Sequence, residues 1–275
     1  MSINYCEKER VFTLQTQNAT YQMIVDSHGY LLHCYYGAKI ERQNLSYCIQ
    51  PQDRGFAANP PDAAGDRTLS PDTLPQEYST FGVGDFRESC LDVRDKNGGV
   101  AADLRYGSYR IYPGKKPLNG LPAAYGNEKD VDTLEIDLRD KVSGLVVTLR
   151  YSVFAQWDVI ARSAEIFNRG TGVLILERAL SCCLDEPVPA SRDILTFYGR
   201  HMGERNLERM PLRHGKFRVD SMRGASSPHY NPFVILCDSA ATETAGNCWA
   251  FSLVYSGDFI AQAEVDQIDT LRFVM

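Results

Sequence analysis

Residues 50–87 bring together side chains that can recognise a polar ligand. Arg54, Arg67 and Arg87 each lie beside an acidic residue or one position away from it. A guanidinium donates several hydrogen bonds in a fixed geometry, while an aromatic ring offers a flat apolar face. The same ion pairs can hold a long loop to its scaffold, and for any single pair this structural role is the commoner one. The aromatic residues of the segment are Phe56, Tyr78, Phe81 and Phe86.

The composition of this segment predicts an ordered loop. Its Pro and Gly content disfavours both a helix and a central strand. Its aromatic residues argue against disorder, and a long loop with its own packing residues is often functional. Three further polar stretches share this irregular character, and their Arg, Tyr and carboxylate side chains would suit a sugar site. These stretches are residues 103–122, 197–211 and 212–232.

No catalytic set can be chosen from the residues alone. His214 and His229 could serve as acid–base groups, but histidines in loops are commoner than catalytic ones. Ser226 and Ser227 lie near His229, yet the G-x-S-x-G turn of an activated serine is absent. The Gly-rich residues 82–85 do not precede a helix, which disfavours a nucleotide site. The 35 acidic residues offer no identifiable glycosidase pair without geometry.

The segments that must position these loops alternate between apolar and polar residues with a period of two. Short β-branched and aromatic runs are separated by turn signals such as Asn-Arg-Gly-Thr-Gly at 168–172. This spacing predicts an all-β sandwich or barrel. Helical periodicity is weak, and only residues 203–210 predict a short helical turn. The expected strands are 12–14, 21–25, 30–36, 134–138, 145–154, 162–167, 173–176, 234–237, 248–255 and 259–265.

The overall composition limits the classes of protein and partner. A hydrophobic content of 44% and a charged content of 23% are typical of a soluble globular protein. The net charge of −6 disfavours a nucleic-acid partner. No apolar run approaches the roughly 18 residues of a membrane span, and the N-terminus lacks a signal-peptide pattern. We therefore expect a cytoplasmic protein with neither a nucleic-acid nor a membrane partner.

The eight cysteines predict free thiols. None forms a C-x-x-C pair, and most lie in apolar runs, where a thiol packs as a small hydrophobic group. Metal ligands would be clustered at set spacings, so we expect neither a metal site nor a cofactor. The cysteines are Cys6, Cys34, Cys48, Cys90, Cys182, Cys183, Cys237 and Cys248.

The chain ends in the apolar run Leu-Arg-Phe-Val-Met at 271–275. A free-standing domain more often ends in a frayed polar segment. We therefore expect a longer polypeptide to continue beyond Met275, and no domain boundary is visible within residues 1–275.

Several segments resemble the N-terminal domain of bacterial α-galactosidases of glycoside hydrolase family 36. The most specific combination is Asp-Thr-Leu-Pro-Gln-Glu-Tyr at 72–78 with Arg-Gly-Ala-Ser-Ser at 223–227. The similar segments span nearly the whole chain. They are 20–37, 53–60, 66–87, 198–200, 204–216, 223–233 and 251–259.

The resemblance implies that residues 1–275 form one β-supersandwich domain, a galactose mutarotase-like fold, with long irregular loops. In the family a (β/α)8 barrel follows and carries both aspartates of a retaining mechanism, which acts on α-galactosides of the melibiose and raffinose type. The resemblance therefore implies no catalytic residue in this chain and a role in assembly and in shaping the substrate pocket. It also implies a homotetramer, in which a loop of this domain reaches the barrel of a neighbouring subunit.

On this resemblance the loop after residue 50 contributes to the substrate site. Asp53 would accept hydrogen bonds from sugar hydroxyls, and Arg67 would contact the substrate or support the loop. Asp66, beside Arg67, would support the loop together with Arg54 and Phe56.

His201 would also be a substrate-binding residue, because it follows Tyr-Gly-Arg at 198–200, where the family commonly has Trp. An imidazole offers less stacking area than an indole. This departure predicts an altered aromatic wall, with a different acceptor preference or reduced activity.

Two other functions stay open at this stage. The first is a free-standing carbohydrate-binding module, which would bind galactose or raffinose without a barrel. The second is a mutarotase-like sugar epimerase, which would need a histidine and a glutamate in one concave site. Its candidate pairs combine His214 or His229 with Glu204 or Glu208.

Overall fold

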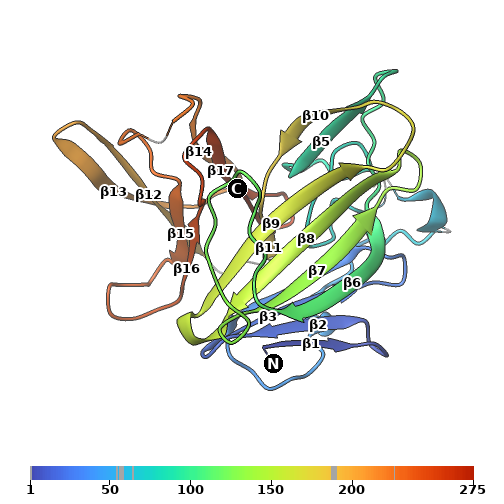
Figure 1. The fold of residues 1–275 in the computed structure, drawn as a ribbon, viewed down its shortest axis with the longest axis horizontal. Helices are drawn as coiled ribbons and strands as arrows, with labels where there is room; N and C mark the ends of the chain where they lie inside the picture. Colours follow the sequence, from blue (N-terminus) through green and yellow to red (C-terminus); the bar gives the residue numbers. More distant parts are fainter. Residues whose placement is uncertain (1, 54, 56–58, 64, 187–190, 226) are drawn as a thin grey trace. The chain divides into compact units, whose positions relative to one another are not determined.

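The computed structural model describes residues 2–53, 55, 59–63, 65–186, 191–225 and 227–275. By contacts the chain divides into two compact units, each described by itself below. Unit 1 comprises residues 1–117 and 125–187, and unit 2 comprises 118–124 and 188–275. Within the described ranges the regular elements are eighteen strands and three short 3-10 helices (Figure 1). The prediction of an all-β fold is confirmed.

Unit 1 contains two four-stranded antiparallel sheets in which each strand pairs with its neighbours in sequence. The first sheet consists of β1 (Ile3–Cys6), β2 (Val11–Gln15), β3 (Ala19–Val25) and β4 (Leu31–Ala38). The second consists of β6 (Arg105–Pro113), β7 (Asp132–Arg139), β8 (Leu145–Phe154) and β9 (Val159–Asn168).

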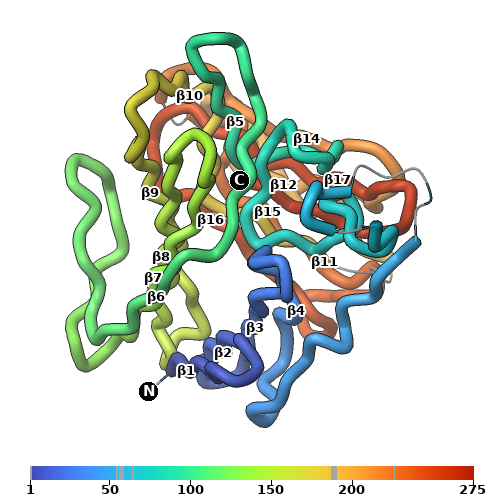
Figure 2. Tube along the Cα trace, turned by 90° about the vertical axis from the view of Figure 1, so that its right-hand side faces the viewer, coloured from blue at the N-terminus to red at the C-terminus, as the bar shows by residue number. Residues whose placement is uncertain are grey.

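The two sheets of unit 1 pack face to face. In Figure 2 the labels of β1, from the first sheet, and β6, from the second, lie in the same part of the view as the N-terminus. The ring centroid of Phe12 lies 5.4 Å from that of Tyr109, and the centroid of Tyr21 lies 6.2 Å from that of Tyr151. Because side chains alternate along a strand, every second residue of β7 and β8 enters the core. These inward residues are Leu134, Ile136, Leu138, Val147, Leu149, Tyr151 and Val153, all at most 3% exposed.

The remaining elements of unit 1 are short. Strands β5 (Leu91–Asp95) and β10 (Leu174–Ala179) form a two-stranded sheet, and β11 (Cys183–Glu186) lies beside β4. The turn predicted at residues 168–172 follows β9, where the side-chain amide of Asn168 donates to the Gly172 carbonyl at 2.7 Å. The 3-10 helices are η1 (Ser46–Cys48), η2 (Pro61–Ala63) and η3 (Ala155–Trp157).

A buried carboxylate holds the middle of the polar segment inside unit 1. The Oε1 atom of Glu77, a fully buried residue, accepts hydrogen bonds from the hydroxyls of Tyr21 on β3 and Tyr151 on β8, at 2.5 and 2.7 Å. Arg162 on β9 places Nη2 at 2.8 Å from the same oxygen, and Nδ1 of His33 on β4 lies 3.4 Å from Oε2. Burial alone would raise the pKa of Glu77, but the Arg162 charge and the hydrogen-bond donors lower it. The carboxylate is therefore ionised and joins both sheets.

A second buried ion pair fixes the end of the same segment. Nε of Arg87 lies 2.9 Å from Oδ1 of Asp85, and both side chains are less than 5% exposed. Nη2 of Arg87 also donates to the carbonyls of Leu74 and Pro71, at 2.8 and 3.0 Å. Residues 69–80 are buried throughout, and Thr68 just before them is half-buried. Among the described residues of this segment, most positions before 69 are thus exposed, whereas 69–80 belong to the core.

Unit 2 contains the antiparallel sheet β13-β12-β15-β16 and three further antiparallel strands in the order β14-β17-β18. The rings of Phe251 on β16 and Phe273 on β18 pack with centroids 4.3 Å apart, which joins the two groups of strands. The bounds are β12 (Arg192–Arg200), β13 (Gly203–Pro211), β14 (Gly215–Ser221), β15 (Phe233–Asp238), β16 (Cys248–Ser252), β17 (Phe259–Val265) and β18 (Leu271–Val274).

The prediction of a helical turn at residues 203–210 is wrong, because β13 occupies this stretch. Leu207 lies opposite Phe197 in the β12–β13 pairing, and a whole ladder of such pairs outweighs the helix preference of Glu, Arg, Leu and Met. Strands β6 and β14 likewise lie in the stretches 103–122 and 212–232, which were expected to be irregular. Their many exposed positions carry Arg, Tyr and Lys, so the alternation of apolar and polar residues is weak there.

The Glu77 cluster predicts a large loss of stability on a small change. Glu77→Gln keeps the volume but leaves the buried Arg162 guanidinium without its carboxylate. We expect the free energy of unfolding to fall by about 3 kcal/mol, as measured by urea denaturation followed by circular dichroism. In the matched control Glu177→Gln, an exposed pair with Arg94 is removed, and the loss should stay below about 1 kcal/mol. Equal losses in the two variants would contradict the central role of Glu77.

Candidate functional site

The structure brings Asp53 and Arg67 together on an exposed turn of unit 1. Nη2 of Arg67 lies 2.9 Å from Oδ1 of Asp53, and the two side chains are 61% and 52% exposed. The amide of Gly55 also donates to Oδ1 of Asp53, at 2.9 Å. Gly55 has a φ of +70°, and a Cβ there would come within 3.3 Å of the Arg67 guanidinium. Only glycine therefore allows this turn without strain. The result is an accessible carboxylate–guanidinium pair, which suits hydrogen bonds to hydroxyl groups.

Asp66 forms hydrogen bonds within the same loop. Its Oδ1 accepts hydrogen bonds from the amide and the hydroxyl of Thr68, at 2.8 and 2.7 Å, and its carbonyl accepts one from the Asn59 side chain at 2.9 Å. The Thr68 hydrogen bonds lower the pKa of Asp66 below its ordinary value. Two other predicted support residues, Arg54 and Phe56, lie outside the residues that the structure describes.

Arg105 on β6 anchors this loop and was not identified from the sequence. Its guanidinium lies 3.9 Å above the ring centroid of Tyr30, and Nη1 donates to Asp62 Oδ2 at 3.1 Å and to the His28 carbonyl at 2.7 Å. Nε donates to Oδ1 of Asp103 at 2.7 Å. The sequence signal was Asp103 two positions before Arg105, because residues two apart lie on one face of a strand.

His201 lies in unit 2, exposed in the turn between β12 and β13. The neighbouring residue Met202 has a φ of +65° and is 87% exposed, and its amide donates to Oε1 of Glu204 at 3.0 Å. The hairpin thus presents the imidazole at its tip, where it is free to meet a ligand.

The histidine–glutamate pairs considered for an epimerase do not form. Nε2 of His214 lies 2.9 Å from Oδ1 of Asp269, and Nδ1 of His229 lies 3.2 Å from the hydroxyl of Ser227. Glu204 instead accepts a hydrogen bond from the Met202 amide within its own turn. Both histidines are therefore engaged by neighbours other than the glutamates that this reaction would need. Across the described ranges, no three His, Cys, Asp or Glu side chains are grouped so that they could hold a metal ion.

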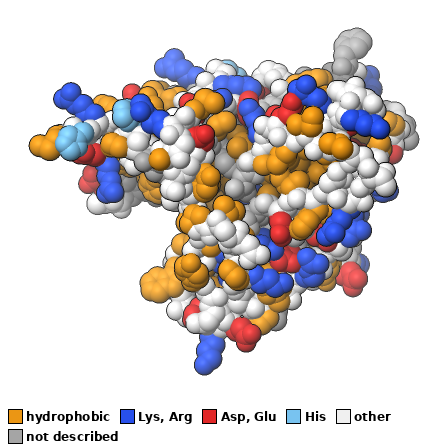
Figure 3. Space-filling view, turned by 45° about the horizontal axis from the view of Figure 1, so that its top comes forward, with side chains coloured by type: hydrophobic (Ala, Val, Ile, Leu, Met, Phe, Trp, Pro, Cys, Tyr) orange, Lys and Arg blue, Asp and Glu red, His pale blue; other side chains and the backbone are white. Residues whose placement is uncertain are grey.

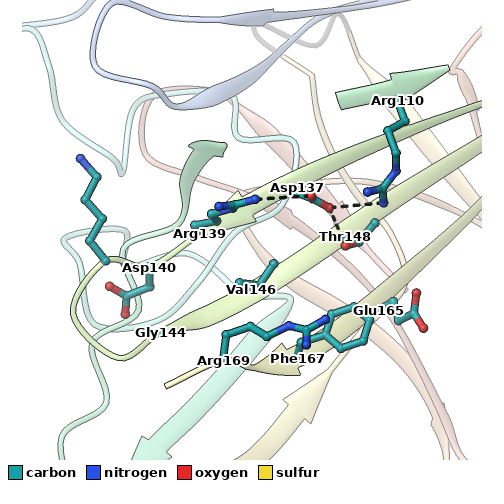
Figure 4. A pocket seen from close by; sticks show the side chains of 11 residues that line it. Arg110, Asp137, Arg139, Asp140, Gly144, Val146, Thr148, Glu165, Phe167 and Arg169 are labelled. Carbon is teal, nitrogen blue, oxygen red and sulfur yellow. Dashed lines mark hydrogen bonds and ion pairs between the residues drawn. The ribbon is translucent and has the colours of Figure 1, made fainter. Parts of the chain in front are cut away.

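A groove of about 550 Å³ lies on the outer face of the β6–β9 sheet (Figure 4). Its acidic side chains all have partners. Asp137 accepts hydrogen bonds from Ser108 and Thr148, at 3.0 and 2.7 Å, and the Asp140 carboxylate caps its own turn. The guanidinium of Arg169 lies 4.8 Å from the ring centroid of Phe167. The groove is thus polar, but its carboxylates already accept hydrogen bonds from the sheet and from their own turns. Figure 3 likewise shows acidic and basic side chains interspersed on the visible face.

Beside this groove, Glu135 on β7 forms the centre of a charge ladder across the strands. Its Oε1 accepts from Tyr112 and from Nε of Arg150, both at 2.8 Å, and Nη2 of Arg110 lies 2.7 Å from Oε2. Burial alone would raise the pKa of Glu135, but the hydrogen bonds from Tyr112, Arg150 and Arg110 lower it to about 2. Arg110 of the stretch 103–122 therefore stabilises the sheet, which is a structural role and not a ligand-binding one.

Comparison with known proteins identifies the chain. Residues 29–275 match the glycosyl hydrolase family 36 N-terminal domain. The chain belongs to this family. The family 36 resemblance of the sequence is confirmed, and with it the assignment of this all-β region to the N-terminal domain.

Characterised family 36 relatives align with the whole chain. The bifunctional α-galactosidase/sucrose kinase AgaSK of Mediterraneibacter gnavus is 47% identical over 275 residues, which are 100% of this chain and 29% of that protein. The α-galactosidase AgaA of Geobacillus stearothermophilus is 44% identical over 276 residues, 100% of this chain and 37% of that protein. The chain thus spans about a third of the length of these relatives.

Solved structures agree. The galactosidase domain of AgaSK superimposes with a TM-score of 0.96 at 47% identity, covering 99% of this chain and 38% of that one. A variant of AgaA from Geobacillus stearothermophilus in complex with raffinose superimposes with a TM-score of 0.92 at 44% identity, covering 96% of this chain and 36% of that one.

The charge ladder predicts a specific loss of stability in acid. Because the folded-state pKa of Glu135 lies below the unfolded value of about 4.5, its contribution is present above pH 4.5 and disappears as the pH falls towards 2. Glu135→Gln should therefore be less stable than the natural protein by on the order of 3 kcal/mol at pH 7, and the two should converge near pH 2. Urea denaturation at a series of pH values measures this difference. A constant difference over the whole range would contradict the linkage.

Proposed function

We propose that this chain is the N-terminal domain of a retaining α-galactosidase that removes terminal α-D-galactosyl residues from melibiose- and raffinose-type oligosaccharides. The observation that carries the proposal is the similarity of the whole chain to AgaA, whose structures include complexes with raffinose and stachyose. At 44% identity and a TM-score of 0.92 over 96% of this chain, the fold is shared.

In the proposed enzyme the chemistry belongs to a barrel domain. A retaining mechanism needs two carboxyl groups about 5–5.5 Å apart, one as the nucleophile and one as the acid–base. The carboxylates that the structure shows in clusters, such as Glu77 and Glu135, are buried and bound by arginines. Their depressed pKa values suit structural anions rather than proton donors. We therefore propose that the 275-residue chain is inactive alone.

The contribution of this domain is a loop that binds the sugar. Asp53 and Arg67 are exposed, lie within hydrogen-bond distance of each other, and stand on a turn anchored through Asp66 and Arg105. A fixed carboxylate accepts from sugar hydroxyls, and a fixed guanidinium donates to them. His201, at the tip of the β12–β13 hairpin, is the proposed second contact.

The wider proposal includes a supersandwich architecture for the whole domain, a homotetramer in the full-length enzyme and a cytoplasmic location. The long exposed hairpin β12–β13 and the Asp53 turn suit contacts with neighbouring polypeptide. The acidic net charge of −6 suits a protein that binds neutral sugars rather than nucleic acid.

The direct test compares the 275-residue chain with the full-length protein that contains it. We expect the full-length protein to hydrolyse p-nitrophenyl α-D-galactopyranoside, melibiose and raffinose, and the isolated chain to release no product. Hydrolysis by the isolated chain would overturn the assignment of the chemistry to a barrel. A full-length protein without α-galactosidase activity would overturn the proposed function itself.

A substitution tests the proposed role of the loop. In the full-length enzyme, Asp53→Asn should lower kcat/KM for raffinose about tenfold, because it replaces a charge-assisted hydrogen bond by a neutral one. The melting temperature should stay within about one degree, since the Asp53–Arg67 pair is exposed. The matched control is Asp130→Asn, which changes another exposed aspartate and should leave both quantities unaltered. Equal kinetics for the two variants would remove Asp53 from the substrate site.

A further inference from the structure

Two of the eight cysteines lie directly opposite each other on neighbouring strands of unit 2. In the β15–β16 pairing Cys237 faces Cys248. The next pair along the strands is joined by a backbone hydrogen bond, from the amide of Asp238 to the carbonyl of Asn247 at 3.1 Å. Because hydrogen-bonded and non-hydrogen-bonded pairs alternate in an antiparallel ladder, Cys237 and Cys248 form a non-hydrogen-bonded pair.

This pairing brings the two sulfur atoms close enough to react. In non-hydrogen-bonded pairs the Cα atoms lie about 4.5 Å apart, which falls within the range of about 4.4–6.8 Å that a disulfide spans. The two side chains also lie near enough to influence each other electrostatically. Oxidation therefore needs rotation of the side chains but no movement of the strands.

The two thiols differ in access. Cys248 is exposed, whereas Cys237 is only 2% exposed. An oxidant in solution thus reaches Cys248 first. Burial raises the pKa of Cys237, which makes this thiol a poor first nucleophile but leaves it in place to attack Cys248 once that residue has been modified.

A cation stands beside the pair. Arg209 on β13 interacts electrostatically with both Cys237 and Cys248. Its guanidinium is fixed by Asp193 Oδ2, 2.6 Å from Nε, and by the carbonyls of Ala241 and Ser239, at 2.7 and 2.9 Å. The positive charge of Arg209 lowers the pKa of Cys237 and so opposes part of the effect of burial.

We propose that Cys237 and Cys248 are a reversible thiol-modification site, which closes to a cross-strand disulfide when the protein meets a low-molecular-weight disulfide. The Cys248 thiolate attacks one sulfur of the small disulfide, forms a mixed disulfide and releases one small thiolate. Cys237 then loses its proton to solvent, attacks Sγ of Cys248 and expels the second small thiolate. In total the two protein thiols are oxidised, and one small disulfide is reduced to two thiols.

Closure has a structural consequence for the sheet. Among the described strands, β16 pairs with β15 alone and forms an edge of its sheet, and it carries Phe251, whose ring packs on Phe273. A covalent link between Cys237 and Cys248 would hold β16 in register with β15. It would also restrict the conformations of the residues between the two cysteines. Reduction would release it again.

The test treats the full 275-residue chain with oxidised glutathione and identifies the products by mass spectrometry. We expect a chain lighter by two hydrogen atoms, about 2 Da, with a tryptic cross-link between the peptides of Cys237 and Cys248. Dithiothreitol should restore the original mass, and the oxidised form should melt several degrees higher. A stable glutathione adduct on Cys248 without cross-link, or a cross-link elsewhere only, would overturn the proposal.

Variants separate the two roles. Cys237→Ala should keep glutathione on Cys248 as a stable adduct, because the second attack has been removed. Cys248→Ser should show neither adduct at this position nor cross-link. The matched control Cys6→Ser leaves the pair intact and should cross-link like the natural chain. Circular dichroism confirms that each variant is folded, and absence of the Cys248 adduct in folded Cys237→Ala would contradict the assignment of the attacking thiol.

Discussion

The ionised carboxylate of Glu77 is the constraint on which the rest of unit 1 depends. A charge without exposure to water must be matched by fixed donors, and here these come from both sheets, through Tyr21, Tyr151 and Arg162. The two sheets, and the segment that carries Glu77, must therefore take one relative arrangement. Apolar packing alone would tolerate small shifts between them, whereas hydrogen bonds of 2.5–2.8 Å would be broken by such shifts.

This constraint explains how an exposed turn can be held with precision. The segment that contains Glu77 begins at the edge of the small core cluster of Tyr30, Leu32, Ala63, Leu69 and Leu74. Its buried half thus fixes the base of the loop, and Arg105 fixes the other side through Asp62. The Asp53–Arg67 pair itself remains exposed. A ligand-binding pair gains most from such support, because its geometry is set before the ligand arrives.

The sequence predicts the fold where apolar residues recur with a period of two, as in β8, and it predicts turns where Gly and Asn cluster, as at 168–172. It fails at β13, where tertiary pairing overrides the local preference for helix, and at residues 69–80, where a segment rich in polar residues is buried. The family resemblance pointed to Asp53 and Arg67 as individual residues, but it did not predict that they contact each other. This contact depends on the left-handed turn at Gly55. Arg105 was missed as a support of the loop because Asp62 and the His28 carbonyl, its partners there, are distant in sequence.

The distribution of charged contacts also decides which polar surface suits a ligand. Within the described residues, the acids of the groove on the β6–β9 sheet already accept from Ser108, Thr148, Arg150 and their own turns, so a ligand would have to compete with the sheet for them. Both side chains of the Asp53–Arg67 pair are exposed, and an exposed ion pair contributes little to stability. Exchanging its mutual contact for contacts with hydroxyl groups therefore costs the fold little. That difference, rather than the number of charges, favours the loop over the groove as the proposed sugar-binding surface.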